Sequence, residues 1–321
     1  MTPDNQESLI DSQPDGMTIV IPAYNEEGAI QETLEALKDV LPRLGRTTEV
    51  LVVDDGSTDS TVELARAAGV RVIRHPVNSG YGKSLMTGIL AATHDTIAIV
   101  DADGTYPISR LVELAATYDR GFQMVVGSRR GKHFDGSRIT WLQRAVFRFL
   151  AEFASGRHIP DINSGFRIFD RRPVLEVRSS FSTGFSFTTT LTLLFLLTHL
   201  HVTYVPVEYH PRIGRTKVRK LKDSLRALQI IITFFAQFNP AKLFLLLLIV
   251  CWAGNVVVGF FAWALYATSL PFSVGLLIGW NTGCIIMACT ALSLLLLKPS
   301  INMERLMEIC SIGDTGHRRR I

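Results

Sequence analysis

Short apolar runs alternate with longer stretches of mixed polarity over residues 17–207. The runs at residues 18–24 and 49–55 are rich in β-branched side chains, and the second is almost continuously apolar, which is typical of a strand buried on both faces. Between them, residues 27–41 repeat leucine and isoleucine at the spacing of one helix face. Three similar runs follow before a last one at residues 203–207. This strand–helix alternation predicts an α/β fold with a mostly parallel sheet.

Polar and acidic residues follow several of the expected strands. They are Asn25, Glu26, Asp54, Asp55, Asp101, Asp103, Ser128 and Arg129. In a parallel sheet, ligands bind beyond the carboxyl ends of the strands, so we expect the functional site at that edge. Ser60 and Glu63, three residues apart, predict a capping box that starts the helix after the second strand.

The C-terminal part of the chain has a different pattern. Residues 243–297 contain no Asp, Glu, Lys, Arg or His. The stretches 243–267 and 273–297 each exceed the roughly 20 residues that a helix needs to cross a bilayer. Pro271 lies in the link between them and is expected to break the helix, so residues 241–298 predict a transmembrane hairpin. Two helices buried in a soluble core would have to be far longer than average.

Basic residues flank this apolar region. Residues 217–240 combine apolar residues at helical spacing with several lysines and arginines, which predicts an amphipathic helix in the membrane interface. An ordinary helix with one solvated face is the alternative. Lysines and arginines occur before the first span and after the second, in the tail 299–321, but not in the link, so we expect both termini in the cytoplasm. The polar tail 1–16 has no apolar core of a secretory signal.

Composition narrows the functional classes. Charged residues make up only 19% of the chain and hydrophobic ones 47%, which argues against disorder. The net charge of +4 is too small to indicate a nucleic-acid-binding protein. None of the 4 cysteines forms a C-x-x-C pair, so neither a zinc site nor a disulfide scaffold is indicated.

Two short motifs suggest phosphate chemistry. Asp101 and Asp103 follow an apolar run, and two carboxylates at such a strand end can face a divalent cation that also binds phosphate oxygens. Taken alone the pair is weak evidence, because acidic residues are common in turns. Residues 78–84 resemble a phosphate loop, but Val77 occupies a position that requires glycine, so a P-loop NTPase is not supported.

The motifs are more specific in combination. PAYNEE, VVDDGSTDST, NSGYGKSL, DADGTYP and GSR occur in this order, each at an expected strand end. The set resembles the family 2 inverting glycosyltransferases, which have the Rossmann-like GT-A fold. Further along, DINSGFRIF, GFSF and the basic run at residues 212–217 resemble the branch of polyprenyl-phosphate sugar synthases. Dolichyl-phosphate mannose synthase and bacterial undecaprenyl-phosphate glycosyltransferases belong to that branch. The resemblance covers residues 17–222 and implies a catalytic domain at residues 17–216.

The resemblance implies a role for individual residues on the donor side. Asp101 and Asp103 match the pair that binds Mg²⁺ or Mn²⁺ on the donor diphosphate. Thr105 stands where many relatives have glutamine or a similar ligand, so Thr105 or water completes the metal shell. The residues that match nucleotide-binding positions are Pro22, Tyr24, Asn25, Glu26, Asp54, Lys83 and Asp101.

The resemblance also implies roles on the acceptor side. Arg148 departs from the pattern, since a small hydroxyl residue is expected there. The expected sugar-binding loop comprises Asp161, Asn163, Ser164 and Gly165. The residues expected at the acceptor phosphate are Arg129, Arg144, Arg148, Arg212 and Arg215. The expected catalytic residues are Asp103, Arg129, Arg144 and Lys217, the last in a segment that closes over the phosphates in the family.

These features together predict a membrane-bound inverting glycosyltransferase of the plasma (inner) membrane. The expected donor is a nucleotide sugar, with UDP favoured over GDP, and the expected acceptor is a polyprenyl phosphate such as undecaprenyl phosphate. A lipid phosphate is already an anion and needs no general base, whereas a hydroxyl acceptor does. A homo-oligomer such as a tetramer stays open, and no nucleic-acid partner is expected. The alternatives are another family 2 glycosyltransferase with a sugar or lipid hydroxyl acceptor, or a noncatalytic membrane scaffold.

Overall fold

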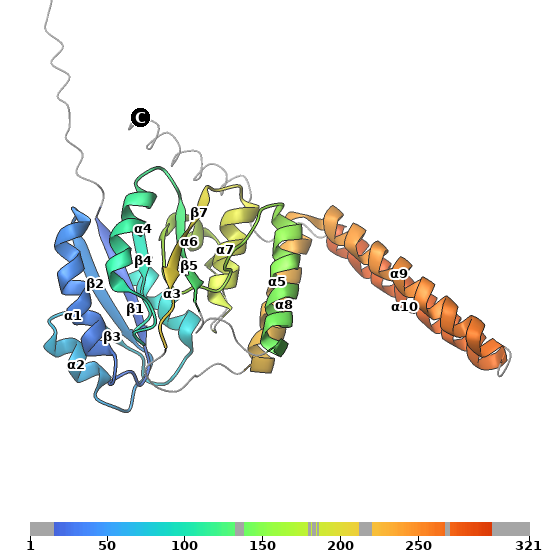
Figure 1. Ribbon diagram of the computed structural model, residues 1–321, viewed down its shortest axis with the longest axis horizontal. Coiled ribbons are helices and arrows are strands. Elements are labelled where there is room, and N and C mark those ends of the chain that lie inside the picture. Colours follow the sequence, from blue (N-terminus) through green and yellow to red (C-terminus); the bar gives the residue numbers. More distant parts are fainter. Residues whose placement is uncertain are drawn as a thin grey trace, which may run out of the picture.

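The computed structural model describes residues 16–131, 138–178, 181, 184, 186–211, 220–266 and 270–296. Within this part, a seven-stranded sheet has the order β3-β2-β1-β4-β6-β5-β7, with helices on both faces (Figure 1). The strands are β1 (Met17–Ala23), β2 (Thr48–Asp54), β3 (Arg71–Arg74), β4 (Thr96–Ile99), β5 (Met124–Arg130), β6 (Arg167–Asp170) and β7 (Val202–Glu208).

The helices follow the strands in the expected alternation. They are α1 (Ile30–Val40), α2 (Thr61–Ala67), α3 (Tyr81–Ala91), α4 (Leu111–Tyr118), α5 (Arg138–Ser155), α6 (Arg172–Glu176), α7 (Phe187–Leu197), α8 (Lys220–Phe238), α9 (Pro240–Tyr266) and α10 (Leu270–Leu296). Two short 3-10 helices, η1 (Leu41–Leu44) and η2 (Ile108–Arg110), precede β2 and α4. The α/β prediction is therefore confirmed.

The sheet is mostly parallel. Strands β1 to β4 run in one direction, and β5 pairs with β7 in parallel. Only β6, among these strands, is antiparallel to its neighbours β4 and β5. In the β1–β2 register, Ala23 lies opposite Asp54, so the two strands end at the same level. The residues that follow them consequently meet at one edge of the sheet.

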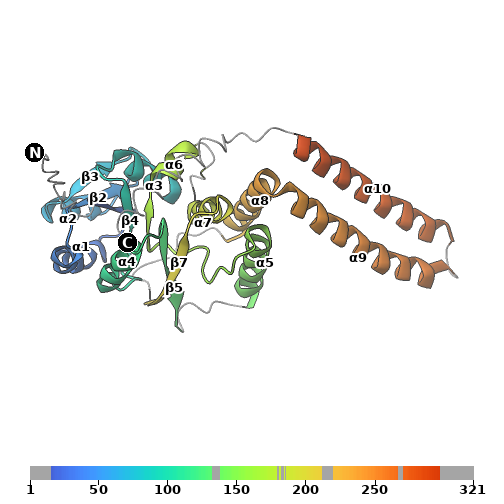
Figure 2. The same ribbon diagram turned by 90° about the horizontal axis from the view of Figure 1, so that it is seen from above.

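The core consists of two layers of apolar side chains, one on each face of the sheet. Helices cover both faces (Figure 2). Along β1, Val20 packs into the layer covered by α3 and α7, whereas Ile19 and Ile21 pack into the layer covered by α1 and α4. This alternation explains why the central strands are apolar almost throughout. Helix α7 is buried along its whole length, which is consistent with its position between the sheet and helices α5 and α8.

The predicted capping box at Ser60 is wrong. Ser60 is the N-cap residue of α2, but its side chain makes no capping hydrogen bond. Its backbone N–H donates to Glu27 Oε2 (3.1 Å), so a carboxylate from the loop after β1 takes the position expected for Glu63. A tertiary contact has thus replaced the local one at the start of α2. Helix α1 begins at Ile30 instead of at residue 27.

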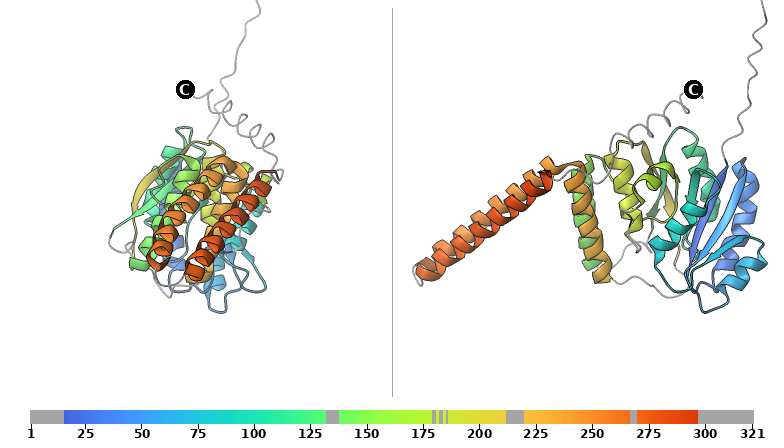
Figure 3. Two further views of the ribbon diagram at one scale, coloured as in Figure 1. Left: turned by 90° about the vertical axis from the view of Figure 1, so that its right-hand side faces the viewer. Right: turned by 180° about the vertical axis from the view of Figure 1, so that it is seen from behind.

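Helices α5 and α8 stand beside the sheet, and α9 and α10 extend away from it as a pair (Figures 1 and 3). The start of α9 is joined to the end of α5, since Asn239 Nδ2 donates to the Ala154 carbonyl and Lys242 Nζ donates to the Phe153 carbonyl, both at 3.3 Å. Because α8 leads directly into α9, the end of α8 also lies beside the end of α5. The two helices therefore run in the same direction.

One helix in the described part is long and apolar enough to cross a membrane. It covers residues Pro240–Ala264 of α9, with a mean hydropathy of 2.5, and α10 contributes a shorter apolar segment, Val274–Thr290. Trp252 and Trp263 on α9 are 71% and 75% exposed. The expected link differs in one respect, because Pro271 lies in the first turn of α10, where a proline removes no helical hydrogen bond. The tails 1–15 and 299–321 lie outside the described residues.

Candidate active site

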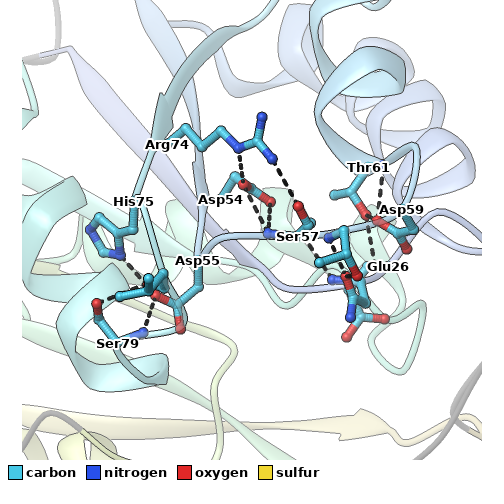
Figure 4. Close-up of polar contacts among 12 residues, drawn as sticks. Glu26, Asp54, Asp55, Ser57, Asp59, Thr61, Arg74, His75 and Ser79 are labelled. Carbon is cyan, nitrogen blue, oxygen red and sulfur yellow. Dashed lines mark hydrogen bonds and ion pairs between the residues drawn. The ribbon is translucent and has the colours of Figure 1, made fainter.

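The loops after β1 and β2 are tied together by hydrogen bonds (Figure 4). Asn25 has a positive φ of 50°, a conformation that asparagine tolerates better than most residues. Its N–H donates to Ser57 Oγ (2.9 Å), and its side-chain Oδ1 accepts from the Thr58 N–H (2.8 Å). The Glu26 N–H donates to Thr61 Oγ1 (2.9 Å). These contacts hold three of the expected nucleotide-binding positions, Tyr24 to Glu26, in one fixed turn.

Asp54 ends β2 with its side chain fully buried. Its two carboxylate oxygens accept from the Ser57 N–H at 3.3 and 3.2 Å, and Arg74 Nε lies 3.3 Å from Oδ2. Arg74 also donates to the Ser57 carbonyl (2.9 Å). Pro22 is buried in β1 beside this strand, opposite Val53. Asp54 therefore sets the shape of the turn that follows β2.

Asp55, which the sequence reasoning did not single out as a functional residue, holds a different loop. Its carboxylate accepts from the N–H groups of Ser79 (2.9 Å) and Gly80 (2.7 Å), and His75 Nδ1 lies 2.8 Å away. His75 Nε2 lies 3.0 Å from Thr87 Oγ1 on α3. Asp55 thereby fixes the glycine-containing loop that leads into α3. The sequence contained one signal for this role, since Asp55 directly follows Asp54 in the motif VVDDGSTDST.

Asp101 and Asp103 follow β4 and are both held by neighbours. The Tyr81 hydroxyl donates to Asp101 Oδ1 (2.8 Å). Asp103 is almost fully buried and accepts from the Thr105 hydroxyl (2.6 Å) and the Thr105 N–H (3.2 Å). In this arrangement Thr105 supports the carboxylate of Asp103.

The donor set fits a divalent cation that arrives with a diphosphate. No cluster of three or more His, Cys, Asp or Glu side chains suited to a metal occurs in the part of the chain that the structure describes. Mg²⁺ is commonly bound by one or two carboxylates together with substrate phosphates and water. Asp101 and Asp103 supply the two carboxylates, and both lie at the edge where ligands bind in parallel sheets.

Arg129 and Asp161 form a bidentate ion pair at the end of β5. Arg129 Nε donates to Oδ2 (2.7 Å) and Nη2 donates to Oδ1 (2.9 Å), while the Arg129 N–H also donates to Oδ2 (3.1 Å). The Asp161 side chain is 3% exposed. Burial opposes its ionisation, but the Arg129 charge and these hydrogen bonds lower the pKa of Asp161 below its ordinary value. Both groups therefore remain charged at neutral pH.

Tyr106 connects the Arg129 pair with the loop at residues 161–165. Its hydroxyl oxygen accepts from the Gly165 N–H (3.0 Å) and from Ser164 Oγ (3.3 Å). Its ring meets Tyr209 edge to face, and the Arg129 guanidinium lies 5.4 Å from the centre of the Tyr209 ring. Burial raises the pKa of Tyr106, so its hydroxyl stays neutral.

Arg167, which was not among the predicted site residues, also holds the loop at residues 161–165. It is fully buried, and its Nε donates to the Ser164 carbonyl (2.9 Å) while Nη1 donates to Thr192 Oγ1 (3.1 Å). Burial lowers its pKa. Asn163 is exposed, and its Oδ1 accepts from Thr189 Oγ1 (2.6 Å). The sequence contained a signal for the structural role of Arg167, since this arginine belongs to the motif DINSGFRIF.

Residues 18–178, about half of the chain, match the family described as glycosyl transferase family 2. The chain belongs to this family. The enzyme is thus a glycosyltransferase, and the resemblance based on its motifs is confirmed.

Curated relatives of this glycosyltransferase include three with informative names. The low-salt glycan biosynthesis hexosyltransferase Agl6 of Haloferax volcanii is 31% identical over 76% of this chain and 61% of its own length. The dolichyl-phosphate hexose transferase of Haloferax volcanii is 30% identical over 64% of this chain and 87% of its own length. The undecaprenyl-phosphate 4-deoxy-4-formamido-L-arabinose transferase of Pseudomonas aeruginosa is 34% identical over 50% of this chain and 49% of its own length. The first and third alignments cover less than two thirds of those relatives. These names support the polyprenyl-phosphate branch.

Solved structures share the fold of the glycosyltransferase domain. Glucosyl-3-phosphoglycerate synthase from Mycobacterium tuberculosis, in complex with Mn²⁺, uridine diphosphate and glucosyl-3-phosphoglycerate, superimposes with a TM-score of 0.55. The comparison covers 68% of this chain and 80% of that one, at 23% sequence identity. The likeness confirms the fold.

The structure describes only some of the remaining predicted site residues of the glycosyltransferase. Lys83 is exposed on α3, and Arg148 is exposed on α5. Arg144 also belongs to α5, but its side chain lies outside the described residues, as do Arg212, Arg215 and Lys217 altogether. Figure 1 shows the first turns of α5 and α8 on the same side of the molecule as the carboxyl ends of β1 and β2. The structure therefore brings Asp101 and Arg129 together with the 161–165 loop, and the roles of all the predicted site residues stay predictions.

Proposed function

We propose that this glycosyltransferase moves a sugar, with inversion, from a nucleotide-sugar donor to the phosphate of a polyprenyl phosphate such as undecaprenyl phosphate. The observation that carries the proposal is that paired carboxylates and a partly buried arginine, Arg129, lie at one sheet edge. Gly165 packs against Asp101 and donates to Tyr106, whose ring contacts Tyr209 beside Arg129. Two relatives whose names contain dolichyl phosphate and undecaprenyl phosphate support the acceptor class.

The donor half of the site would bind the nucleotide and its diphosphate. The loops held by Asp54 and Asn25 would hold the base and ribose, with UDP favoured over GDP because a structural neighbour was solved with uridine diphosphate. Asp101 and Asp103 would hold Mg²⁺ or Mn²⁺, and such an ion offsets charge on a departing diphosphate. The residues assigned to the nucleotide are Pro22, Tyr24, Asn25, Glu26, Asp54, Lys83 and Asp101.

The acceptor half of the site would bind the lipid phosphate. A guanidinium carries five N–H groups, so Arg129 can hold Asp161 and also donate to a phosphate. A phosphate acceptor is already ionised, so no carboxylate has to remove a proton during transfer. The residues assigned to this phosphate are Arg129, Arg144, Arg148, Arg212 and Arg215, with Lys217 closing over the phosphates. The loop assigned to the sugar comprises Asp161, Asn163, Ser164 and Gly165.

A lipid acceptor fits the apolar C-terminal helices. We propose a catalytic domain at residues 17–216, an interface helix at 217–240 and a membrane hairpin at 241–298, with the catalytic domain and both termini in the cytoplasm at the inner membrane. The exposed tryptophans and the 25-residue apolar segment of α9 support this arrangement. A reporter fused after Ile321 should locate to the cytoplasm, and one inserted at residues 268–270 should locate to the opposite side. Termini on opposite sides would contradict the hairpin. Assembly into a tetramer stays a prediction.

The deciding experiment supplies the purified, detergent-solubilised protein with undecaprenyl phosphate and a panel of UDP- and GDP-sugars, with Mn²⁺. We expect a polyprenyl-phosphate sugar from one donor and no product from the Asp103→Asn variant. Undecaprenol, which has a hydroxyl in place of the phosphate, serves as the matched acceptor control. Product with undecaprenol or free sugars but not with the phosphate would favour another family 2 activity. Absence of any transfer or donor binding would favour a noncatalytic scaffold.

A further inference from the structure

Tyr81 connects the loop held by Asp55 to the carboxylate pair after β4. It is the first residue of α3, directly after Gly80, whose φ of 104° lies in the region that favours glycine. Because Asp55 accepts from the N–H groups of Ser79 and Gly80, the start of α3 cannot shift without breaking those bonds. The position of the Tyr81 ring is therefore determined by the end of β2.

The Tyr81 hydroxyl donates to Asp101 Oδ1 at 2.8 Å. A phenol is protonated at neutral pH and a carboxylate can only accept, so the hydroxyl is the hydrogen-bond donor in this contact. A donor at this distance stabilises one orientation of the carboxylate.

Gly165 confines the same carboxylate from the other side. A Cβ atom added to Gly165 would lie 2.4 Å from Asp101 Oδ2, so the backbone of the 161–165 loop packs directly against the carboxylate. The Gly165 N–H donates to Tyr106, which keeps this backbone in place. Asp101 is thus held between a hydroxyl on Oδ1 and a backbone segment at Oδ2.

We propose that Tyr81 is a positioning residue that orients Asp101 for the divalent cation and donor diphosphate. The inference rests on the proposed function, in which Asp101 is a metal ligand. Residues that hydrogen-bond to a metal ligand set its orientation, and changing them commonly costs about 10–100-fold in metal affinity or activity. In this chain the contacts that orient Asp101 start with Asp55, because Asp55 holds the loop before α3 and Tyr81 is the first residue of that helix.

The test compares Mn²⁺ binding by the full-length wild-type protein and the Tyr81→Phe variant, each with saturating UDP. Phenylalanine keeps the ring and removes only the hydroxyl. Electron paramagnetic resonance of unbound Mn²⁺ gives the affinity directly, without any activity measurement. We expect the Mn²⁺ dissociation constant to rise about 10- to 100-fold, while the thermal unfolding midpoint stays close to that of the wild type. Raising Mn²⁺ should restore most of the transferase activity.

A second tyrosine provides a matched control. Tyr118 is buried on α4 beside Thr96 at the start of β4, whereas the carboxylate pair follows the end of that strand, so Tyr118→Phe should leave Mn²⁺ affinity unchanged. Asp103→Asn separates this inference from the proposed function on which it rests. If Asp103→Asn keeps wild-type Mn²⁺ affinity, the metal site itself is wrong. If Asp103→Asn loses Mn²⁺ but Tyr81→Phe retains wild-type affinity, the metal site stands and the positioning role of Tyr81 is wrong.

Discussion

The two edges of the central sheet, where the parallel strands begin and where they end, both carry clusters of polar contacts, yet these contacts hold different parts of the chain. At the amino edge, Glu49 accepts from Thr18 Oγ1 (2.8 Å), Thr93 Oγ1 (2.7 Å) and Arg71 Nη1 (2.8 Å). Thr18 and Arg71 lie at the starts of β1 and β3, and Thr93 lies in the link between α3 and β4. At the carboxyl edge, Asp54 and Asp55 accept from backbone N–H groups of the loops that line the candidate site.

The difference shows that hydrogen bonding alone does not separate structural from functional carboxylates. Glu49 and Asp55 each accept several hydrogen bonds, and only their position on the sheet distinguishes them. Because the parallel strands β1 to β4 run in one direction and end on the same side of the sheet, side chains after them converge on one region, whereas those before them join strands. We therefore expect changes at the carboxyl edge to reduce activity and changes at the amino edge to reduce stability.

The largest expected effect is at Asp103. Asp103→Asn keeps an oxygen that can accept from Thr105 but removes the charge needed to bind a cation. Turnover should fall by more than about 100-fold, because changes to residues that merely support a metal ligand already cost 10–100-fold. Initial rates with saturating donor and lipid phosphate give the effect, and thermal unfolding checks that the fold is intact. Full activity in a chelator-treated assay would contradict a metal-dependent mechanism.

The next effect extends the comparison to α5. Arg144→Ala should weaken the dependence on lipid phosphate, since losing a hydrogen bond to a charged group costs about 1.5–3 kcal/mol, or roughly ten- to a hundred-fold in affinity. Nucleotide affinity, measured by titration, should change little. Arg144→Lys should restore the activity only in part, because an ammonium cannot form a bidentate contact. Arg130→Ala, at an exposed residue, is the control. Weakened nucleotide binding with normal lipid dependence would overturn the assignment of Arg144.

At the amino edge we expect a loss of stability with unchanged kinetics. Burial opposes ionisation of Glu49, but hydrogen bonds from Thr93, Arg71 and Thr18 outweigh it and lower its pKa from 4.5 to about 2. Its contribution to stability is therefore complete above pH 4.5 and is lost as the pH falls toward 2. Glu49→Gln should lower the free energy of unfolding at pH 7 by on the order of 1–3 kcal/mol.

Denaturant titrations of wild type and Glu49→Gln at pH 7 and pH 3 measure this difference. The difference in unfolding free energy between the two proteins should narrow at pH 3, because there Glu49 is protonated in the unfolded wild-type chain while it stays largely ionised in the folded one. A gap that stays constant, or a large loss of transferase activity in Glu49→Gln, would show that the amino edge is not purely structural.

The smallest effect is expected at Arg71. Its side chain is 49% exposed, and it supplies only one of the hydrogen bonds to Glu49. A partly solvated ion pair of this kind contributes below about 1 kcal/mol, and less at high salt. Arg71→Ala should therefore lower the unfolding free energy by less than Glu49→Gln does. The same titrations, repeated at low and high salt, test the order. A larger loss in Arg71→Ala would place the main stabilising charge on the arginine.

The sequence predicted much of the fold because its signals were local. The run at residues 49–55 predicted β2, and residues 203–207 predicted β7, each within about one residue of its observed bounds. The capping-box prediction was wrong because the Ser60 N–H donates to Glu27, which is distant from Ser60 in sequence. Pro271 was expected in the link but lies within α10, since a helix accepts proline in its first turn.

The candidate site was predictable to the extent that its residues follow strands or belong to motifs. Asp54, Asp101, Asp103 and Arg129 were all expected at the carboxyl edge, where the structure has them. The partners of these residues were not predictable. The Arg129–Asp161 pair joins residues from β5 and the loop before β6, and the Tyr81–Asp101 contact joins α3 to the end of β4.

The sequence by itself determined the periodicity of strands and helices, the apolar C-terminal stretches and the motifs that lead to the glycosyltransferase family. These depend on residue spacing, which an extended chain already contains. Only the tertiary structure decided which carboxylate accepts from which group, that Asp55 positions the loop before α3, and that Gly165 confines Asp101. Such contacts depend on the order and register of strands that are far apart in the chain, because sheet pairing brings their ends together only after folding.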